Sequence, residues 1–408
     1  MPRVLKPAGA APLAVIAVLA AGAIVPARAS RVSATAPVSI PFDPAARHVI
    51  VRATVNGSRP LSFILDSGAN VAIVRTEVAK ELGLTLEGNV TAGGAGAGTQ
   101  TGSFVRQASW SLVGMPDFKQ PVTFALPLPE LPSTMGRPID GIIGGEFIKQ
   151  FVVELDYQTH LLTLHNRDEF RYTGPGEAIP IEFVNVTHPV LHARVTAGGE
   201  PIERPFVLDI GAGGALSLHS PFVREQKLLE DGRPTIRAIG GTGAGGRTTG
   251  RLGRVQSLQI GSYVLKEPLT MFSQDTAGAF ANAQLAGNIG AQIAMRFKLF
   301  LDYGGKRIIF EPSLLFGTPF DRASSGMVLR ALGDDFRTFS VIDVLEDSPA
   351  SEAGIRADDV ITSIDATPAS ALTMFGIQQM FEMARAYVLG IQRGPEKLSV
   401  RLTTRKLI

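Results

Sequence analysis

The alternation of apolar and polar side chains predicts that most of this chain forms β-strands. Residues His48–Val55 alternate along the chain, which is the pattern of a strand with one buried face. Two shorter runs, Phe63–Leu65 and Pro205–Leu208, are apolar throughout and each is followed by an aspartate, as in fully buried strands. Thr76–Leu82 has the character of a short helix. We therefore expect a mainly β fold.

Blocks of similar sequence occur twice, in the same order, over about two thirds of the chain. The paired blocks are His48–Val55 with His188–Val195, Arg59–Ala69 with Glu203–Ala212, Asp140–Gly145 with Ala286–Ala291, Phe151–Tyr157 with Phe297–Tyr303, and Leu161–Leu164 with Arg307–Phe310. One duplication of this length excludes a solenoid and predicts two homologous lobes, each of ordinary domain size. We place the lobes at residues 40–170 and 180–312.

Each predicted lobe contains one glycine-rich segment. These segments are Ala92–Thr101 and Ile239–Thr249. They carry few side chains that could pack into a core, so we expect mobile loops or hairpin tips.

The composition changes after Pro312, which indicates a further domain. Residues 313–326 are the candidate linker, and residues 327–408 form a small α+β unit. The pattern in this unit predicts the order strand, strand, short helix, strand, long helix, strand.

Composition supports this picture and excludes several classes of protein. A length of 408 residues implies two or three domains, and 44 glycines with 27 prolines favour a turn-rich β protein. The formal net charge of +2 argues against a nucleic-acid-binding protein. The absence of cysteine excludes disulfides, thiolate metal sites and cysteine nucleophiles. None of the six histidines forms a metal-binding motif such as H-E-x-x-H, so we expect no metal and no cofactor.

The first residues resemble a secretory signal peptide. Arg3 and Lys6 precede an apolar run, Ala8–Val25, and Ala27–Ala29 has the A-x-A form of a cleavage site. This pattern predicts a signal segment over residues 1–29, with cleavage after Ala29 and a periplasmic or secreted protein. The alternative is an uncleaved membrane anchor.

The candidate chemistry lies in two turns of the form Asp-x-Gly-Ala, one in each lobe. They are Asp66-Ser67-Gly68-Ala69 and Asp209-Ile210-Gly211-Ala212. Equivalent positions of a duplicated unit can bring two carboxyl groups face to face. Two such groups about 3 Å apart cannot both ionise, so the pair shares one proton. The ionised carboxylate can then activate a water molecule while the protonated one donates to a carbonyl oxygen. The glycines allow each chain to turn tightly behind its aspartate.

The segments Phe63–Ala69 and Ile142–Gly144 resemble those of aspartic peptidases, most closely the retropepsin-like bacterial members. The resemblance covers roughly residues 40–312. It implies two β-barrel lobes, a substrate cleft between them, a polypeptide substrate, and Asp66 and Asp209 as the catalytic pair. It also implies that Ser67, Gly68, Ala69, Gly211 and Ala212 support the active-site loops. By the same resemblance, Gly94, Gly96, Gly243 and Gly245 belong to flaps over the cleft.

The second lobe departs from the family pattern at two positions. Ile210 replaces the Ser or Thr whose hydroxyl normally bonds to the opposite lobe, and Asn288 is polar in a segment that is usually apolar. Two other interpretations therefore stay open. The cleft of a non-catalytic protein could bind peptides without cleaving them, with Asp209 as a turn residue. Alternatively, lobes of different chains could pair, although both halves are already present in this one.

The C-terminal unit resembles a PDZ domain of exported bacterial proteases. The likeness rests on Phe339–Ile355 and Ala357–Asp365, which include Ser-Pro-Ala-x-x-Ala-Gly-Ile. It implies that the unit binds a polypeptide by adding a strand to a sheet edge. The alternative is that this domain only packs against the lobes.

Two further motifs lack the context that their usual functions require. Gly144–Phe147 spells a nucleotide-cyclase signature, but its copy at Gly290–Ile293 identifies it as a structural part of each lobe. Gly241–Gly246 matches G-x-G-x-x-G without the preceding strand and following helix of a dinucleotide site.

Overall fold

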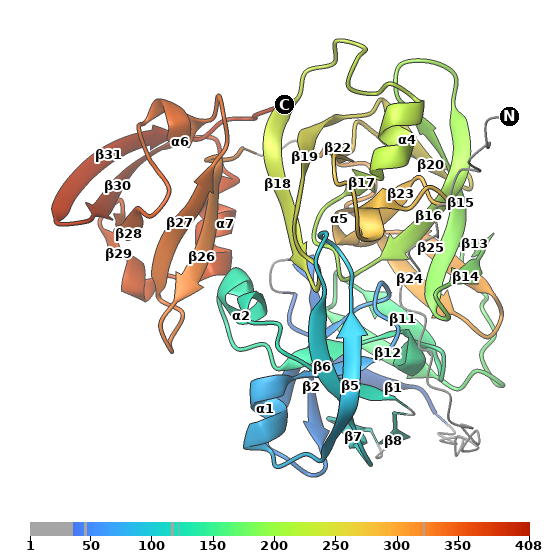
Figure 1. Cartoon of the computed structure of the whole chain (residues 1–408). Coiled ribbons are helices and arrows are strands. Elements are labelled where there is room, and N and C mark those ends of the chain that lie inside the picture. Colours follow the sequence, from blue (N-terminus) through green and yellow to red (C-terminus); the bar gives the residue numbers. More distant parts are fainter. Residues whose placement is uncertain (1–35, 45–46, 116–117, 121, 321–322) are drawn as a thin grey trace, which may run out of the picture.

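The computed structural model describes residues 36–44, 47–115, 118–120, 122–320 and 323–408, and it has the predicted mainly β fold (Figure 1). The predicted signal segment lies outside the described residues. Within these ranges, no helix has both the length and the hydropathy needed to cross a membrane.

The first lobe is built on one mixed sheet with the strand order β5-β6-β9-β4-β10-β3-β2-β7-β8. Its strands are β2 (Val49–Val55), β3 (Leu61–Leu65), β4 (Ala72–Arg75), β5 (Leu86–Ala92), β6 (Gln100–Val105), β7 (Ser109–Leu112), β8 (Phe118–Lys119), β9 (Thr123–Leu126) and β10 (Gly141–Ile143). Its helices are α1 (Thr76–Glu81), α2 (Glu130–Met135) and α3 (Gly145–Ile148). Trp110 is fully buried in this lobe.

The second lobe repeats this topology strand for strand, with the order β18-β19-β22-β17-β23-β16-β15-β20-β21. Its strands are β14 (Glu182–Val184), β15 (His188–Thr196), β16 (Ile202–Asp209), β17 (Leu216–Leu218), β18 (Ile236–Gly243), β19 (Gly246–Arg254), β20 (Ser257–Ile260), β21 (Tyr263–Lys266), β22 (Leu269–Ser273) and β23 (Gly287–Gly290). Its helices are α4 (Ser220–Glu225), the 3-10 helix η2 (Ala279–Ala281) and α5 (Ala291–Ala294). The shared order reflects the duplication in the sequence.

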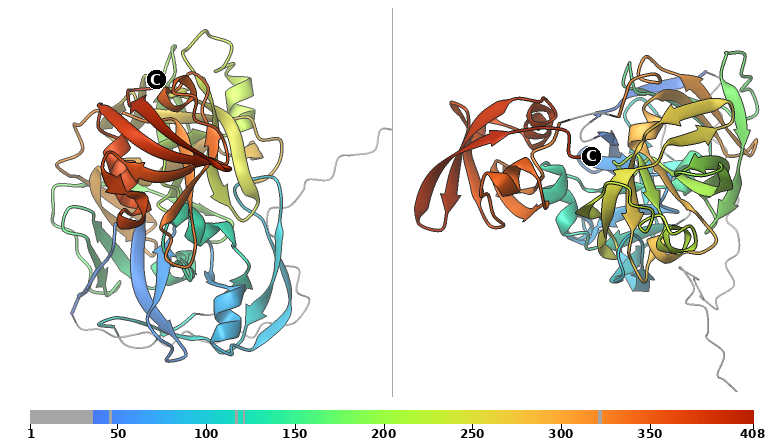
Figure 2. Two further views of the ribbon diagram at one scale, coloured as in Figure 1. Left: turned by 90° about the vertical axis from the view of Figure 1, so that its left-hand side faces the viewer. Right: turned by 90° about the horizontal axis from the view of Figure 1, so that it is seen from above.

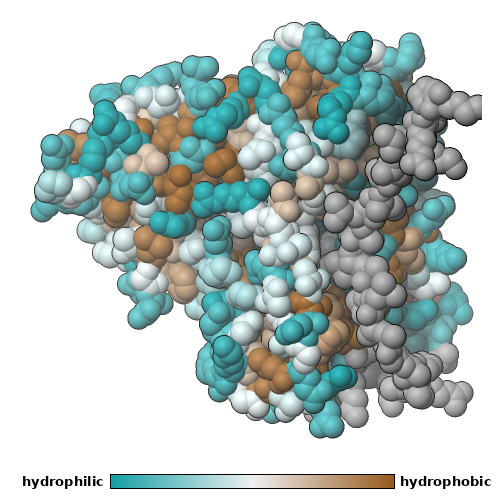
Figure 3. Space-filling view, in the orientation of Figure 1, coloured by the Kyte–Doolittle hydropathy of each residue, from teal (hydrophilic) through white to brown (hydrophobic). Residues whose placement is uncertain are grey.

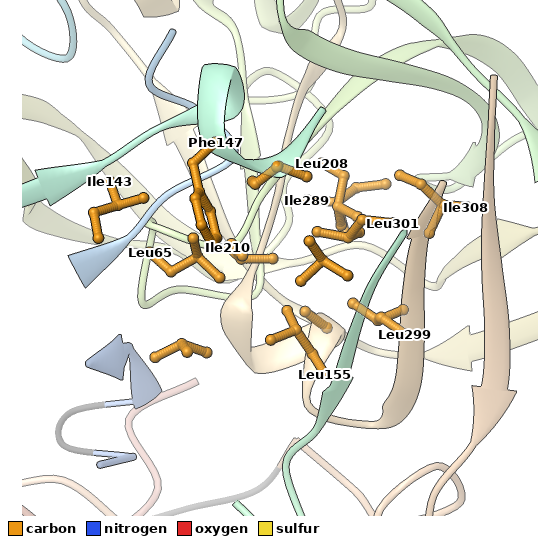
Figure 4. Close-up of a cluster of buried hydrophobic side chains, with 14 of the residues drawn as sticks. Leu65, Ile143, Phe147, Leu155, Leu208, Ile210, Ile289, Leu299, Leu301 and Ile308 are labelled. Atoms are coloured by element: carbon orange, nitrogen blue, oxygen red, sulfur yellow. The ribbon is translucent and has the colours of Figure 1, made fainter. Parts of the chain in front are cut away.

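A third sheet joins the two lobes. Its order is β1-β12-β11-β24-β25-β13, and β11 of the first lobe pairs antiparallel with β24 of the second. The strands are β1 (Val38–Pro41), β11 (Val152–Asp156), β12 (Leu161–His165), β13 (Glu177–Pro180), β24 (Phe297–Asp302) and β25 (Arg307–Pro312). Figure 4 shows a buried cluster containing side chains of both lobes, among them Leu65, Leu155, Leu208 and Leu301. The lobes therefore share one hydrophobic core.

The C-terminal domain has its own sheet, β26-β27-β28-β30-β31, and its own core. Its strands are β26 (Met327–Leu332), β27 (Thr338–Val344), β28 (Val360–Ile364), β29 (Thr367–Pro368), β30 (Ala386–Arg393) and β31 (Glu396–Thr403). Its helices are α6 (Pro349–Glu352), the 3-10 helix η3 (Ala369–Ala371) and α7 (Met374–Phe381). Figure 2 shows this domain standing beside the two lobes, and Figure 3 shows hydrophobic atoms among the hydrophilic ones on its surface.

Two predictions for this domain were wrong in detail. The expected long helix, α7, has only 8 residues. The expected single last strand is a hairpin, in which Arg393 of β30 pairs with Glu396 of β31. Gly394 adopts φ +52° between them, a conformation that glycine tolerates and that lets the chain reverse.

The segment that leads to the C-terminal domain is anchored to the second lobe. The Arg296 guanidinium donates to the carbonyl oxygens of Leu315, Thr318 and Pro319. It also stacks 3.6 Å from the ring centre of buried Phe320.

In addition, α2 of the first lobe packs against β26 (Figure 1), and Arg237 of β18 lies 3.3 Å from Glu346.

His188, the first residue of β15, makes the stability of the fold depend on acidity. Burial lowers the pKa of His188 to about 4 from 6.5. Stability from the neutral ring is fully present above pH 6.5 and is lost as the pH falls toward 4. The expected loss between pH 7 and pH 4 is about 3 kcal/mol. His188→Gln should remove most of this loss when urea unfolding is compared at the two pH values. His192→Gln, an exposed position of the same strand, is the control. Equal pH dependence in all three proteins would contradict the prediction.

Candidate active site

Asp66 and Asp209 occupy equivalent places, each at the end of a central strand of its lobe. Asp66 follows β3, which pairs in parallel with β10, and Asp209 ends β16, which pairs in parallel with β23. Both turns are held by the short helix that follows the partner strand. The Gly145 N–H donates to the Ala69 carbonyl at 2.8 Å, and the Ala291 N–H donates to the Ala212 carbonyl at 2.7 Å.

The two turns approach so closely that each glycine lies against the aspartate of the other lobe. A Cβ placed on Gly68 would be 2.7 Å from Cγ of Asp209, and one placed on Gly211 would be 2.2 Å from Cγ of Asp66. Both carboxyl groups lie at this junction of the turns, each against the glycine of the opposite lobe. The structure thus brings the two predicted aspartates together, and the lack of a side chain at both glycines makes this approach feasible.

The surroundings of the two carboxyl groups differ. Asp66 Oδ1 accepts from the Gly68 N–H at 2.7 Å, and Asp209 Oδ2 accepts from Asn288 Nδ2 at 2.8 Å. Desolvation, and then the charge of Asp209, raise the pKa of Asp66 well above 3.8. Desolvation also raises the pKa of Asp209, but the amide of Asn288 opposes this rise. Both carboxyl groups therefore hold their protons to a higher pH than usual, and the amide of Asn288 opposes this effect at Asp209.

Ser67 connects the two turns. Its side chain is buried, its hydroxyl donates to the Leu208 carbonyl at 2.7 Å, and its Oγ accepts from the Ile210 N–H at 3.0 Å. Ile210 cannot return such a bond, and its side chain is instead fully buried in the shared core (Figure 4). The cross-link between the turns is one-sided, with apolar packing in place of its second half.

The two glycine-rich segments form hairpins whose tips meet. The Gly98 N–H, near the tip between β5 and β6, donates to the Gly245 carbonyl in the turn between β18 and β19 at 2.8 Å (Figure 1). A Cβ on Gly96 would lie 2.4 Å from that carbonyl oxygen, and one on Gly243 would lie 2.7 Å from Cβ of Ala95. Gly94 also belongs to this contact, because a Cβ placed on it would lie 3.6 Å from Cβ of Ala244. Its carbonyl accepts from the Ala279 N–H of η2 at 3.0 Å.

One of the two expectations for the second segment was wrong. Ile239–Thr249 is mostly strand, not loop, because β18 runs to Gly243 and β19 resumes at Gly246. Glycine backbones pair in the ladder without side chains, as Gly243 does with Gly246. The expectation of a hairpin tip agrees with the structure.

The sequence analysis missed a polar chain behind Asp209. Asn288 Oδ1 lies 2.9 Å from Nε2 of His219, a buried histidine at the start of α4. Asn288 was noted only as a departure from an apolar pattern, and His219 only as one of six histidines. The sequence did contain one signal. Asn288 lies two residues before Gly290, where the first lobe has the apolar Ile142.

Within the described part of the chain, no group of three or more His, Cys, Asp or Glu residues is arranged to hold a metal ion.

Comparison with known proteins adds one finding. Residues 51–147 match a sequence-family model described as aspartyl protease. The matched region begins in β2 and ends in α3, so it contains the Asp66 turn and the first hairpin. No curated protein matches the chain.

Proposed function

We propose that this protein is an aspartic endopeptidase in which Asp66 and Asp209 activate a water molecule. The observation that carries the proposal is the close approach of two carboxyl groups from equivalent turns of duplicated lobes. The match of residues 51–147 to an aspartyl protease family supports it independently.

The chemistry follows from the unequal protonation of the pair. The ionised carboxylate accepts a proton from water as the water oxygen attacks the carbonyl carbon of the peptide bond. The protonated carboxyl donates its proton to the carbonyl oxygen, which gives a neutral diol. The carboxyl group that took the proton from water then gives it to the amide nitrogen, and a hydroxyl of the diol returns a proton to the other carboxylate. The C–N bond breaks, and an amine and a carboxylic acid are released. This is general acid–base catalysis without a covalent intermediate.

The substrate class follows from the hairpins. Their tips meet through glycine backbone rather than through side chains, so backbone groups become available to an extended polypeptide when the tips separate. Two backbone hydrogen bonds, from Gly98 to Gly245 and from Ala279 to Gly94, hold the first hairpin to the second lobe, and they are a small barrier to opening.

The remaining parts of the proposal concern location and recognition. The sequence at residues 1–29 supports export to the periplasm or secretion, with membrane attachment only if that segment is uncleaved. The likeness of residues 327–408 to PDZ domains supports a second polypeptide-binding surface. In this domain, β26 is an edge strand of the sheet and accepts a pairing partner on one side only.

The pH dependence of cleavage is a direct test. We expect a bell-shaped profile of kcat/KM, because the pair works only with one proton. Activity should rise as the first proton leaves and should fall only well above pH 3.8, because desolvation and the charge of Asp209 raise the pKa of Asp66. Cleavage of a mixed peptide library, measured from pH 3 to pH 9 by mass spectrometry, would give the profile and the bond preference.

Adding an inhibitor to this assay distinguishes an enzyme from a peptide-binding protein. A pepstatin-type inhibitor, whose hydroxyl occupies the place of the attacked carbonyl, should raise the melting temperature and stop turnover. Ile210 is the feature that favours the alternative, because the cross-link between the turns is one-sided. Peptide binding without turnover at every pH would establish the binding protein instead.

A further inference from the structure

We propose that Asn288 and His219 are positioning residues that fix the roles of the two aspartates, with Asp209 as the proton acceptor and Asp66 as the proton donor. The inference rests on the proposed function and adds a division of roles that neither the duplication nor the family match assigns.

The first step is the contact with Asp209. Asn288 lies on β23, directly beside β16, and its Nδ2 donates to Asp209 Oδ2 at 2.8 Å. A donor at this distance stabilises the ionised form of a carboxyl group more than the protonated form. No side-chain nitrogen within the described residues makes such a bond to Asp66, whose carboxyl accepts from the Gly68 backbone.

The second step is the orientation of the amide. A side-chain amide has one donor end and one acceptor end, so it turns its NH2 group to Asp209 only if its oxygen has a donor on the other side. Both ring nitrogens of His219 face oxygen atoms, and a neutral ring carries a proton on only one of them. The shorter contact is that of Nε2 with Asn288 Oδ1, at 2.9 Å, so we place the proton on Nε2, which then donates to Asn288. The ring is buried against Phe280, and Nδ1 lies 3.2 Å from the Asn282 carbonyl. His219 thus selects the amide orientation that favours a charged Asp209.

The third step is the comparison with the first lobe, which serves as an internal reference. Asn288 stands opposite Ser217 in β17, and Ile142 stands opposite Ile73 in β4, at the equivalent place. His219 and Arg75 are likewise equivalent, since each follows the last residue that pairs with β23 or with β10. Only the second lobe therefore has a polar chain that reaches its aspartate.

The groups that can influence Asp209 electrostatically are few. Asp66 faces it directly, and His219 reaches it through Asn288. Desolvation raises the pKa of the Tyr303 phenol, and the nearby charges of Asp66 and Asp209 raise it further. Since Asp66 and Tyr303 are both acids, the chain through Asn288 supplies the side-chain contact that favours a negative charge on Asp209.

The variant Asn288→Ile gives the second lobe the residue of the first. We expect the acidic limb of kcat/KM to move up by about one pH unit and kcat to fall about 10- to 100-fold, with KM changing less than kcat. His219→Leu should have a similar, smaller effect. His219→Gln, whose amide can still donate to Asn288, should restore most of the activity. If these residues only stabilise the fold, both His219 variants would lower the melting temperature alike and the pH profile would not move.

A readout that does not depend on activity separates this inference from the proposed function. The carbon-13 signals of the two carboxyl groups, followed by NMR from pH 2 to pH 9, should show that Asp209 ionises first in the wild type. In Asn288→Ile, its ionisation should shift upward. If the wild type cleaves no peptide but titrates in this way, the proposed function fails and the inference stands. Titration of Asp66 first, or no shift in Asn288→Ile, would overturn the inference.

Discussion

Replacing either aspartate of the pair by asparagine is expected to lower peptide cleavage by about 10³- to 10⁴-fold. Asparagine has nearly the same shape, so the turns should keep their structure, but Asp209→Asn removes the proton acceptor and Asp66→Asn removes the acid. Cleavage rates with a fluorogenic peptide, measured for both variants, would check this. Asp334→Asn, at an exposed turn of the C-terminal domain, is the matched control.

The same variants carry a stability signature. The pKa of Asp66 is higher in the folded protein than in the unfolded chain. The contribution of Asp66 to the free energy of unfolding is therefore fully present below its pKa in the unfolded chain, and it is lost as the pH rises through its pKa in the folded protein. Asp66→Asn removes this loss, so the variant should match or exceed the wild type in melting temperature at pH 8. Cleavage that survives in both asparagine variants would contradict the proposed role of the pair.

The second large effect is expected from a single methyl group at Gly211. A Cβ at this position would lie 2.2 Å from Cγ of Asp66, so Gly211→Ala must displace the Asp66 carboxyl group or push the two turns apart. We expect a loss of cleavage of at least about 100-fold, because misplaced catalytic groups lose their geometry. We also expect a loss of about 1–3 kcal/mol in the free energy of unfolding, because the site is overpacked. Cleavage assays and urea denaturation would measure both effects.

Gly214 provides a control in the same loop. A Cβ there meets no atom within 4 Å, and its backbone is not in the left-handed region, so Gly214→Ala should be neutral or slightly stabilising. If Gly211→Ala cleaves peptides as fast as Gly214→Ala, the turns do not approach each other as closely as the structure has them.

Much of the architecture could be predicted because short segments of similar sequence occur in both lobes. Apolar runs before Asp66 and Asp209 predict central strands, and the repeated Gly-containing turns predict two equivalent loops. The strand count at the end of the C-terminal domain could not be predicted in this way, because the turn at Gly394 is short and the strands around it are half polar. The anchoring of the linker by Arg296 was also hidden, since a cation that binds distant carbonyl groups leaves no local pattern.

The site was harder to predict than the fold. The two aspartates stand out because they are repeated, whereas Asn288 and His219 matter because they differ from the first lobe. Their contact joins β23 to the start of α4, which lie far apart in sequence, and only the sheet register brings them together. Likewise, Ile210 suggested a weakened turn, but the structure gives its side chain a place in the shared core.

The sheet that joins the lobes also gives the molecule a fixed direction across its two halves. Because β11 and β24 belong to one chain and pair in one register, each half meets its partner in a single, permanent arrangement. A site made of two identical halves would accept a bound peptide in either direction, N to C or reversed. Here the halves are unequal, so the two directions differ in energy, and we expect every substrate to lie across the molecule in the same sense.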